Sequence, residues 1–247
     1  MLKEIKKFYN KIKILKYSED PENEEIPITH IKIFYKEYPR LFSIKLPNIN
    51  KEDSEFETIL DYRGSQRLFS DKPLKLEEIS KIIGSCRIIK SDFSVTDNPL
   101  GKERRTYPSG GARFPVELYI LSYNIKSLED GAYHYNLRKN SLEQLLKKDL
   151  KPIRREIISP YLDNPAASII FTSVISRSEV KYGLKAYPFS LIEAGHMGQN
   201  IQLASSEIGL GSCPVSGFVD ATIQKILDLT ENEIPIYSIN IGHIKRY

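Results

Sequence analysis

The chain contains few of the residues that bind metals or form covalent cross-links. Cys86 and Cys213 are the only cysteines among 247 residues, so at most one disulfide could form. Neither the cysteines nor the four histidines have the spacing of a metal-binding motif. We therefore expect no metal site, and we interpret both cysteines as reduced thiols in a cytoplasmic protein.

Long apolar runs and clustered basic residues are also missing. No stretch reaches the roughly 18 apolar residues that a membrane-spanning helix requires. The basic start of the chain, residues 1–20, lacks the uninterrupted apolar core of a signal peptide. The net charge of +4 comes from lysines spread along the chain, whereas nucleic-acid binding usually needs a basic face. The sequence thus predicts neither a membrane partner nor a nucleic-acid partner.

The glycine-rich motifs of common nucleotide-binding proteins are absent. Residues 209–218 contain several glycines, but they follow a helical pattern and do not connect a strand to a helix, as a dinucleotide fingerprint does. No Walker A loop occurs, so we do not expect binding of a nucleoside triphosphate. There is also no internal repeat and no low-complexity tract.

The length and composition fit a soluble globular protein with one large domain or two small ones. Hydrophobic residues make up 40% and charged residues 28% of the chain. Residues 1–50 are rich in Lys, Ile and Tyr and contain an acidic, proline-bearing break at 18–25. We interpret them as an N-terminal arm made of a helix, a loop and an extended stretch over 26–35. The predicted domain body covers residues 51–247.

Hydrophobic periodicity predicts an α+β arrangement of the body. Helices are expected over residues 75–83 and 189–208, and Gly209 is placed where a helix commonly ends. Residues 91–115 carry many Pro, Gly, Ser and Arg residues and are expected to form a long loop, which in a compact domain is often functional. The expected strands cover residues 116–123, 131–135, 167–175 and 234–241.

The longest predicted helix contains small residues among its apolar ones. Gly195 and Gly198 lie inside it, and a glycine within a helix costs about 1 kcal/mol relative to alanine. Another part of the protein is therefore expected to approach this helix closely. Tight packing in the core and burial at a dimer interface explain the pattern equally well.

Two guanidinium groups and a hydroxyl lie within five residues at the start of the body. The segment comprises Arg63, Gly64, Ser65 and Arg67, with a glutamine before the last of these. Arginine matches phosphate oxygens in a bidentate manner, and serine adds a short donor. The segment is a candidate phosphate-binding site, and a solvated basic turn is the alternative.

Two segments rich in small residues could expose backbone N–H groups to a planar or anionic ligand. The first precedes a predicted strand, and the second follows the longest helix. For the first segment, an ordinary loop turn is the alternative. The first segment comprises Pro108, Ser109, Gly110 and Gly111, and the second comprises Pro214, Val215, Ser216 and Gly217.

Lys181 and Tyr182 lie between a predicted buried strand and the longest helix. A lysine beside a phenol could move protons if burial left its amine uncharged. Most lysines are solvated, which is the alternative for this pair. Cys213 lies next to the second small-residue segment, and we interpret it as a small packed residue, with a redox role as the alternative.

Taken in order, these segments resemble the nitroreductase superfamily and, within it, the SagB-type dehydrogenases. The resemblance covers about residues 35–247. It rests on the motifs Arg63-x-Ser65-x-Arg67-x-Phe69, Pro108-Ser109-Gly110-Gly111, Phe114-Pro115-Val116-Glu117-Leu118-Tyr119, Gly131-Ala132-Tyr133-His134-Tyr135, Lys181-Tyr182-Gly183, Glu193-Ala194-Gly195-His196 and Pro214-Val215-Ser216-Gly217-Phe218.

The resemblance implies a central mixed, largely antiparallel sheet flanked by helices, in an interlocked homodimer with FMN at the interface. It implies that Arg63, Ser65 and Arg67 hold the FMN phosphate and ribityl chain. Residues 108–111 of either subunit would line the isoalloxazine, and residues 214–217 would present backbone N–H groups near flavin N5. The C-terminal Lys245 or Arg246 would add a phosphate contact.

The Lys181–Tyr182 pair matches the branch of the family that oxidises azoline rings to azoles in a ribosomally made peptide. In that chemistry a base removes a ring proton while a hydride passes to flavin N5. The implied partners are a cyclodehydratase and a precursor peptide. Arg113 departs from the usual family loop and could alter the substrate pocket. The alternatives are a general NAD(P)H-dependent nitro- or quinone reductase and a non-catalytic scaffold subunit.

Overall fold

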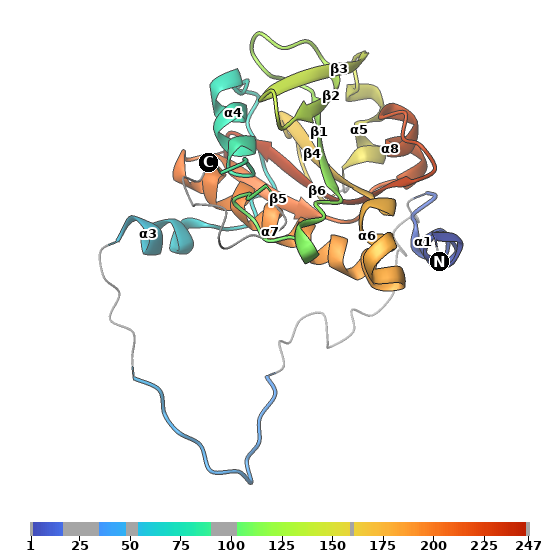
Figure 1. Cartoon of the computed structure of the whole chain (residues 1–247). Coiled ribbons are helices and arrows are strands. Elements are labelled where there is room, and N and C mark those ends of the chain that lie inside the picture. The colour runs from blue at the N-terminus through green and yellow to red at the C-terminus, as the bar shows by residue number, and fades with distance from the viewer. Residues whose placement is uncertain (1, 17–34, 48–53, 90–102, 159–160, 246–247) are drawn as a thin grey trace, which may run out of the picture.

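The central layer of the molecule is a six-stranded sheet (Figure 1). The computed structural model describes residues 2–16, 35–47, 54–89, 103–158 and 161–245. The strands follow the order β3-β2-β1-β4-β6-β5, and every neighbouring pair is antiparallel. The strand bounds are β1 Val116–Ser122, β2 Gly131–Asn136, β3 Ser141–Lys147, β4 Ala167–Val174, β5 Gly211–Val215 and β6 Glu233–Gly242.

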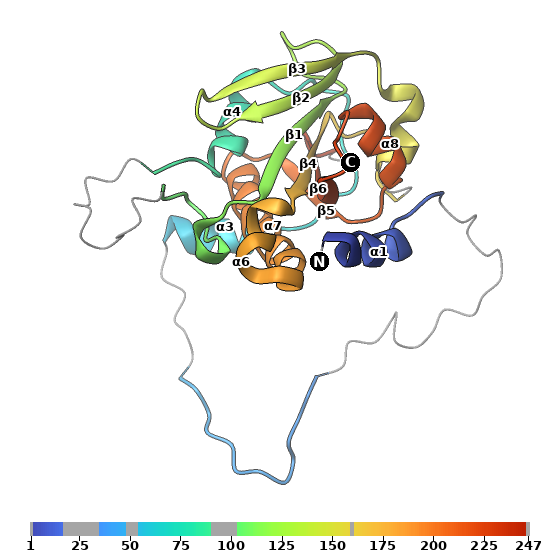
Figure 2. The same cartoon turned by 45° about the vertical axis from the view of Figure 1, so that its right-hand side comes forward.

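Helices cover both faces of the sheet. Figure 2 shows α4 and α8 on opposite sides of the strands. The helix bounds are α1 Leu2–Ile12, α3 Glu55–Tyr62, α4 Leu76–Gly84, α5 Arg154–Ile157, α6 Ser176–Tyr182, α7 Ala186–Glu207 and α8 Asp220–Ile226, with single 3₁₀ turns η2 Gly110–Ala112, η3 Lys151–Ile153 and η4 Gly183–Lys185.

The strand period of two divides the core into a layer on each face of the sheet. On β1, Leu118 and Ile120 face the layer that contains α4 and α7. Tyr119 and Leu121 face the layer that contains α5 and α8. β4 lies in the middle of the sheet and is buried on both faces, which explains its continuous apolar sequence.

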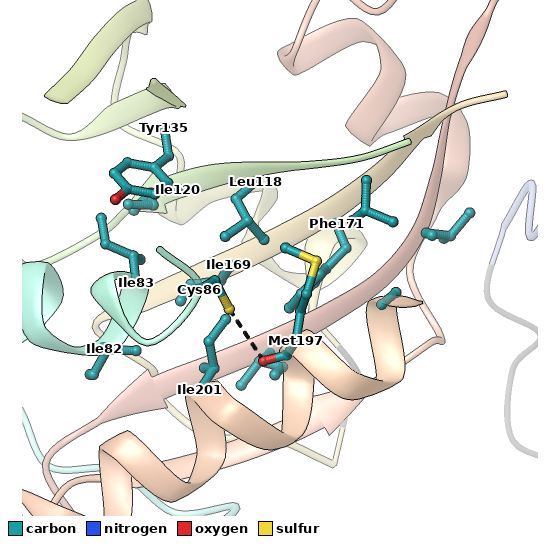
Figure 3. Packing of buried hydrophobic residues seen from close by; sticks show 14 of the residues in the cluster. Ile82, Ile83, Cys86, Leu118, Ile120, Tyr135, Ile169, Phe171, Met197 and Ile201 are labelled. Atoms are coloured by element: carbon teal, nitrogen blue, oxygen red, sulfur yellow. Dashed lines mark hydrogen bonds between the residues drawn. The ribbon is translucent and has the colours of Figure 1, made fainter. Parts of the chain in front are cut away.

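The first layer is packed around the middle of α7 (Figure 3). Met197 and Ile201 of this helix lie against apolar side chains of β1 and β4. Cys86, which follows α4, is fully buried there and donates a hydrogen bond of 3.5 Å to the Met197 carbonyl. Burial raises the pKa of the Cys86 thiol to about 12. Both cysteines are buried and free, so neither takes part in a disulfide.

The two glycines of α7 have different surroundings. A Cβ on Gly198 would lie 2.7 Å from a ring carbon of Tyr237 in β6, so close packing in the core requires glycine there. A Cβ on Gly195 would meet no atom within 4 Å, and Gly195 lies on the exposed face of the helix. Core packing therefore explains Gly198, and Gly195 remains available to a partner.

The start of the chain is attached to the body by buried apolar residues of α1 and by two hydrogen bonds to Asp220. Ile5 and Tyr9 of α1 are buried in the first core layer. The Tyr9 hydroxyl donates to Asp220 at 2.6 Å, and the Ile14 backbone N–H donates to the same carboxylate at 2.7 Å. The extended stretch expected over residues 26–35 lies outside the described residues except for its last residue, and the domain boundary at residue 50 stays a prediction.

Most of the strands and helices expected from periodicity are present within a few residues of their predicted bounds. α7 begins at Ala186, three residues before the expectation. Residues 211–215, which lie outside the expected strands, form the edge strand β5. Of the long loop expected over 91–115, the described part from residue 103 onward is irregular apart from η2.

We predict that Tyr9→Phe lowers the free energy of unfolding by about 1–3 kcal/mol, because Asp220 would lose a buried hydrogen-bond donor. The measurement is the urea midpoint at constant m-value. Tyr35→Phe is the matched control, because Tyr35 is 80% exposed. Equal midpoints for the two variants would show that this contact does not stabilise the fold.

Candidate functional site

The arginine-rich segment follows α3 and lies beside the edge strand β5. Ser54 caps the start of α3 by accepting a hydrogen bond from the Glu57 N–H, and the chain is extended at Arg63, where the helix ends. The Gln66 N–H then donates to the Ser212 carbonyl at 2.9 Å, and Ser65 forms a parallel bridge with Ser212. The guanidinium segment is therefore held against β5 by backbone pairing.

The C-terminal segment joins this group of residues. The Lys245 N–H donates to the Leu68 carbonyl at 3.2 Å, one residue beyond Arg67. Arg63 and Arg67 are exposed, whereas Ser65 is half-buried between them. The structure thus brings Arg63, Ser65, Arg67, β5 and Lys245 together, as a phosphate site would require. Arg246 lies outside the described residues.

Residues 214–217 end β5 and continue beyond it. Pro214 and Val215 pair with Ile239 and Ser238 of β6, and Ser216 is exposed. Proline has no N–H group, so backbone donors can come only from the three residues that follow Pro214. Burial raises the pKa of the Cys213 thiol, an effect that the nearby Arg67 guanidinium opposes.

The second group of residues forms where the loop before β1 meets the end of α6. The Ser109 hydroxyl accepts a hydrogen bond of 2.9 Å from the Phe114 N–H, which closes the loop on itself. Gly111 lies in this loop with φ of 59°. A Cβ on Gly111 would collide with the Tyr182 hydroxyl and would lie 3.1 Å from Lys181 Nζ. Only glycine therefore allows this approach.

The Lys181–Tyr182 pair is oriented by its neighbours. Lys181 is exposed, and its ammonium lies 5.3 Å from the centroid of the Tyr182 ring. The Tyr182 ring meets Phe189 of α7 edge to face, with centroids 5.0 Å apart. The structure therefore brings the pair together with residues 108–111, which lie about 70 residues earlier in the chain.

Glu193 is a further ionisable residue of this group, and the sequence analysis placed it in a motif without assigning it a role. It lies in α7, is 2% exposed, and accepts a hydrogen bond from the Val116 N–H at 3.4 Å and another from Ser109. Burial raises its pKa to about 7, although Arg105 and Arg177 oppose the shift. In the sequence, Glu193 is flanked by Ile192, Ala194 and Gly195, and a carboxyl group among such residues is the signal that could have indicated its burial.

A groove of about 340 Å³ lies beside Glu193 on the outer side of α7. The loop before β1 forms one wall, and α7 forms the other. Its surface is mostly apolar, with one buried carboxyl and one imidazole, so a planar ring could be received there. The lining residues are Pro108, Ser109, Gly110, Phe189, Ile192, Glu193 and His196.

The two groups of residues lie toward opposite ends of α7. Lys181 and Tyr182 precede its first turn, and Ser212 follows its last turn by five residues. The 22 residues of α7 span about 33 Å. Figure 1 shows α6 and α3 well apart, on opposite sides of the molecule. A single subunit therefore does not bring the phosphate-binding candidates next to the Lys181–Tyr182 pair.

A model of the nitroreductase family matches residues 60–243. The chain belongs to the nitroreductase family. This membership confirms the predicted resemblance and indicates an oxidoreductase. The exposed guanidinium groups of Arg63 and Arg67 suit a phosphate group. At Gly111 the Tyr182 hydroxyl already occupies the place of a side chain.

Two curated relatives show the range of the family that the chain resembles. The nitroreductase-like protein MJ1384 of Methanocaldococcus jannaschii is 28% identical over 204 residues, which cover 81% of this chain and 95% of that protein. The microcin B17-processing protein McbC of Escherichia coli is 28% identical over 155 residues, which cover 60% of this chain and 56% of McbC. The match to McbC thus spans little more than half of that protein.

A solved structure confirms the fold. A chain of the E. coli microcin synthetase McbBCD complex with truncated pro-MccB17 bound superimposes with a TM-score of 0.76. The match covers 99% of this chain and 93% of that one at 23% sequence identity, so it shows the fold alone. The predicted nitroreductase-like α+β fold with a largely antiparallel sheet is confirmed.

Two further classes of site are absent from the described part of the chain. No helix there is both long enough and apolar enough to pass through a bilayer. Within the same residues, no three or more His, Cys, Asp or Glu side chains gather in a way that could hold a metal ion.

We predict that Glu193→Gln makes the stability of the protein less dependent on pH. The folded-state pKa of about 7 exceeds the ordinary value of 4.5, so the folded protein binds the proton more tightly than the unfolded chain. Stability of the unsubstituted protein should therefore fall as the pH rises from about 4.5 to about 7, by on the order of 3 kcal/mol.

Urea unfolding at about pH 5 and about pH 8 measures this difference. The exposed Glu77→Gln serves as the matched control, because it changes the same charge in α4. A parallel pH dependence in the Glu193→Gln and Glu77→Gln proteins would contradict the buried, protonated carboxyl.

Proposed function

We propose that this protein is an FMN-dependent dehydrogenase that oxidises azoline rings to azoles in a ribosomally made peptide. The observation that carries the proposal is the contact of Lys181 and Tyr182 with Gly111. It combines the proton-handling pair of the azoline-oxidising branch with the loop that the family resemblance assigns to the isoalloxazine. Lys181 and Tyr182 are the proposed catalytic residues.

The residues beside β5 are the proposed phosphate site. The exposed guanidinium groups of Arg63 and Arg67 can each donate two parallel hydrogen bonds, and Ser65 and Lys245 can add further donors. Gly64 leaves room for the ligand between the two arginines, since only the side-chain amide of Gln66 lies within 4 Å of its missing Cβ. When bound, FMN supplies the two-electron redox chemistry, with a hydride accepted at N5.

The side chains near Gly111 have separable tasks. Lys181 in its amine form can accept the proton that leaves the ring carbon, and the Tyr182 hydroxyl, which lies at the same glycine, can orient the ring or relay the proton. Ser109 and Glu193 hold the loop in place through their hydrogen bonds. The apolar groove on α7 limits the access of water.

A homodimer would complete the site. The phosphate candidates and the Lys181–Tyr182 pair lie toward opposite ends of a helix about 33 Å long. A second copy packed against α7 in the antiparallel direction would place the Lys181 end of one subunit beside the Arg63 end of the other. The exposed face of α7 carries the open Gly195 together with Leu191 and Ile192, which are 40% and 57% exposed. These features support the dimer.

The comparisons support the class of substrate. McbC is a microcin B17-processing protein, and the structural match lies in a synthetase complex with a truncated pro-peptide. We propose by analogy that this chain acts with a cyclodehydratase on a precursor peptide. The similarity to MJ1384 over 95% of its length favours the second candidate, a general NAD(P)H-dependent nitro- or quinone reductase. A non-catalytic scaffold is the third, and the exposed arginines argue against it.

We predict that purified protein carries FMN and that Arg63→Gln/Arg67→Gln weakens FMN binding about 100-fold or more, because two charged hydrogen-bonding groups are lost. Riboflavin lacks the phosphate, so its affinity should be unchanged. Fluorescence titration of each flavin measures both constants. Arg155→Gln in α5 is the control for loss of charge. A protein that takes up no FMN would exclude the flavin-dependent function.

We predict that Lys181→Ala slows azole formation by about 100- to 10,000-fold, because the general base is removed. The FMN dissociation constant should stay within about twofold. Lys185→Ala is the matched control, since Lys185 is exposed and lies in the next turn, η4. The measurement follows oxidation of an azoline-containing peptide by mass.

The Lys181→Ala variant also separates the candidate functions. Rapid reduction of the flavin by NAD(P)H, with nitroaromatic turnover that Lys181→Ala leaves unchanged, would support the general reductase. Retained azole formation in Lys181→Ala would remove the proposed role of the pair.

A further inference from the structure

A second groove, of about 430 Å³, lies on the side of the η2 loop away from α7. Its walls come from Glu103 and Arg105, from residues 112–114, from β1 and β2, from the turn after β2, and from α6. Charged side chains dominate the lining: Arg105, Arg113, Arg138, Arg177, Glu103 and Glu117. With four guanidinium groups and two carboxylates, the lining has an excess of positive charge.

Both carboxylates of this lining already have cationic partners. Arg105 forms an ion pair with Glu103 at 2.9 Å and donates to the Tyr107 hydroxyl at 2.8 Å. Arg177 forms an ion pair and a hydrogen bond with Glu117. These two arginines are therefore occupied, and the lining offers no free acidic group to a cationic ligand.

His134 adds to the pairing of the acidic groups. Its Nε2 lies 3.2 Å from Glu117, and its Nδ1 lies 3.1 Å from Glu143 of β3. The hydrogen bond with Glu117 raises the pKa of His134, and the bond with Glu143 acts in the same direction. A proton on this imidazole would neutralise part of the acidic charge at the floor of the groove.

Arg113 and Arg138 are the remaining cations. Arg113 donates only through Nε, to the Arg177 carbonyl at 2.7 Å, so its two terminal nitrogens have no partner among the described residues. The Arg138 guanidinium has no hydrogen bond or ion pair within the described chain, and it lies on the turn that Asn136 closes by accepting from the Lys139 N–H at 3.0 Å. Both side chains line the groove.

We propose that this groove binds a carboxylate of the peptide substrate, with Arg113 as the bidentate donor and Arg138 as the second cation. The proposal rests on the proposed function, because it assigns a preference for acidic residues to the same peptide substrate. The carboxylate can come from an Asp or Glu side chain or from the C-terminus of the peptide. Arg113 is thus a specificity-determining residue rather than a catalytic one.

The groove and the catalytic pair share a wall. Ala112 lines the groove and follows Gly111, which contacts Lys181 and Tyr182. Arg177 also lines the groove and lies one helical turn before Lys181 in α6, so both side chains project from one side of that helix. A carboxylate held here would therefore lie within a few residues of the ring that reacts.

A carboxylate fits this groove better than a phosphate does. Three glutamates, Glu103, Glu117 and Glu143, lie in or next to the lining. A phosphate group carries up to two negative charges, and it would be repelled by these side chains more strongly than a singly charged carboxylate. Leu137, Ala112 and Phe114 also supply apolar surface for the backbone and side chains of a peptide.

The test uses two coumarin-labelled Gly/Ser peptides with blocked termini that differ only in one central Asp or Asn. Fluorescence anisotropy with the FMN-loaded full chain measures both dissociation constants. We expect the Asp peptide to bind about tenfold more tightly than the Asn peptide, equal to about 1.4 kcal/mol. Arg113→Gln should remove most of this preference, and Arg138→Gln part of it.

Two further variants control for charge and for folding. Arg113→Lys keeps the charge but loses the planar fork, so it should retain an intermediate preference. Arg155→Gln removes one positive charge from α5, outside the groove, and should leave the preference intact. Arg138 lies on an exposed turn, so its variant remains informative if substitution of Arg113 prevents folding.

An undiminished preference for Asp in both Arg113→Gln and Arg138→Gln would overturn the inference. An equal loss in Arg155→Gln would do so as well, because it would show a general effect of charge. NADPH is tested as a competitor of the peptide. If Arg113→Gln weakens the binding of NADPH more than it weakens the binding of the peptide, the groove is instead a phosphate site.

The binding assay separates this inference from the proposed function. Arg113-dependent binding of the Asp peptide without any azoline oxidation would remove the proposed function and leave the groove as a peptide site. Azoline oxidation with no preference between Asp and Asn peptides would leave the proposed function and remove the groove. When the proposed function and the assignment of the groove are both correct, Arg113→Gln should raise KM for acidic azoline peptides at unchanged kcat.

Discussion

The close approach of Lys181 and Tyr182 to the backbone of Gly111 is the constraint on which the candidate site depends. A side chain at position 111 would occupy the place of the Tyr182 phenol, and the backbone there has a left-handed φ of 59°, so both features require glycine. Ser109 fixes that conformation from within the loop, and Glu193 fixes it from α7. A steric requirement at one glycine thus connects the buried carboxyl of a core helix to the exposed Lys181 and the half-buried Tyr182.

Long elements with many apolar residues were predictable from the sequence, and short or half-polar elements were not. β4 is a continuous apolar run of strand length, and α7 is a long helix that ends just before Gly209, so their existence was evident. β5 has the sequence Gly-Ser-Cys-Pro-Val, whose intrinsic β-propensity is low, and it forms because β6 pairs along its whole length. β3 is an edge strand in which leucines alternate irregularly with polar residues, and α8 has only seven residues, so neither leaves a strong local signal.

The candidate site was predictable as a set of segments but not as an arrangement. The order of the motifs identified the residues, and the structure then separated them into two groups. Spacing along the chain contains no information on which end of a helix a loop will reach, so the distance between Arg63 and Lys181 could not be foreseen. The role of Glu193 could be recognised only from the fold, because its partners Ser109 and Val116 lie about 80 residues earlier in the chain.

The burial of both cysteines has a consequence for an enzyme that would act on cysteine-derived rings. Attack on a disulfide or an electrophile requires the thiolate, and burial raises the pKa of Cys86 to about 12 and that of Cys213 above its ordinary value. Few thiolates therefore exist near neutral pH, and mixed disulfides with a thiol-rich peptide would form slowly. Burial thus protects Cys86 and Cys213 from thiol–disulfide exchange with a cysteine-containing substrate peptide.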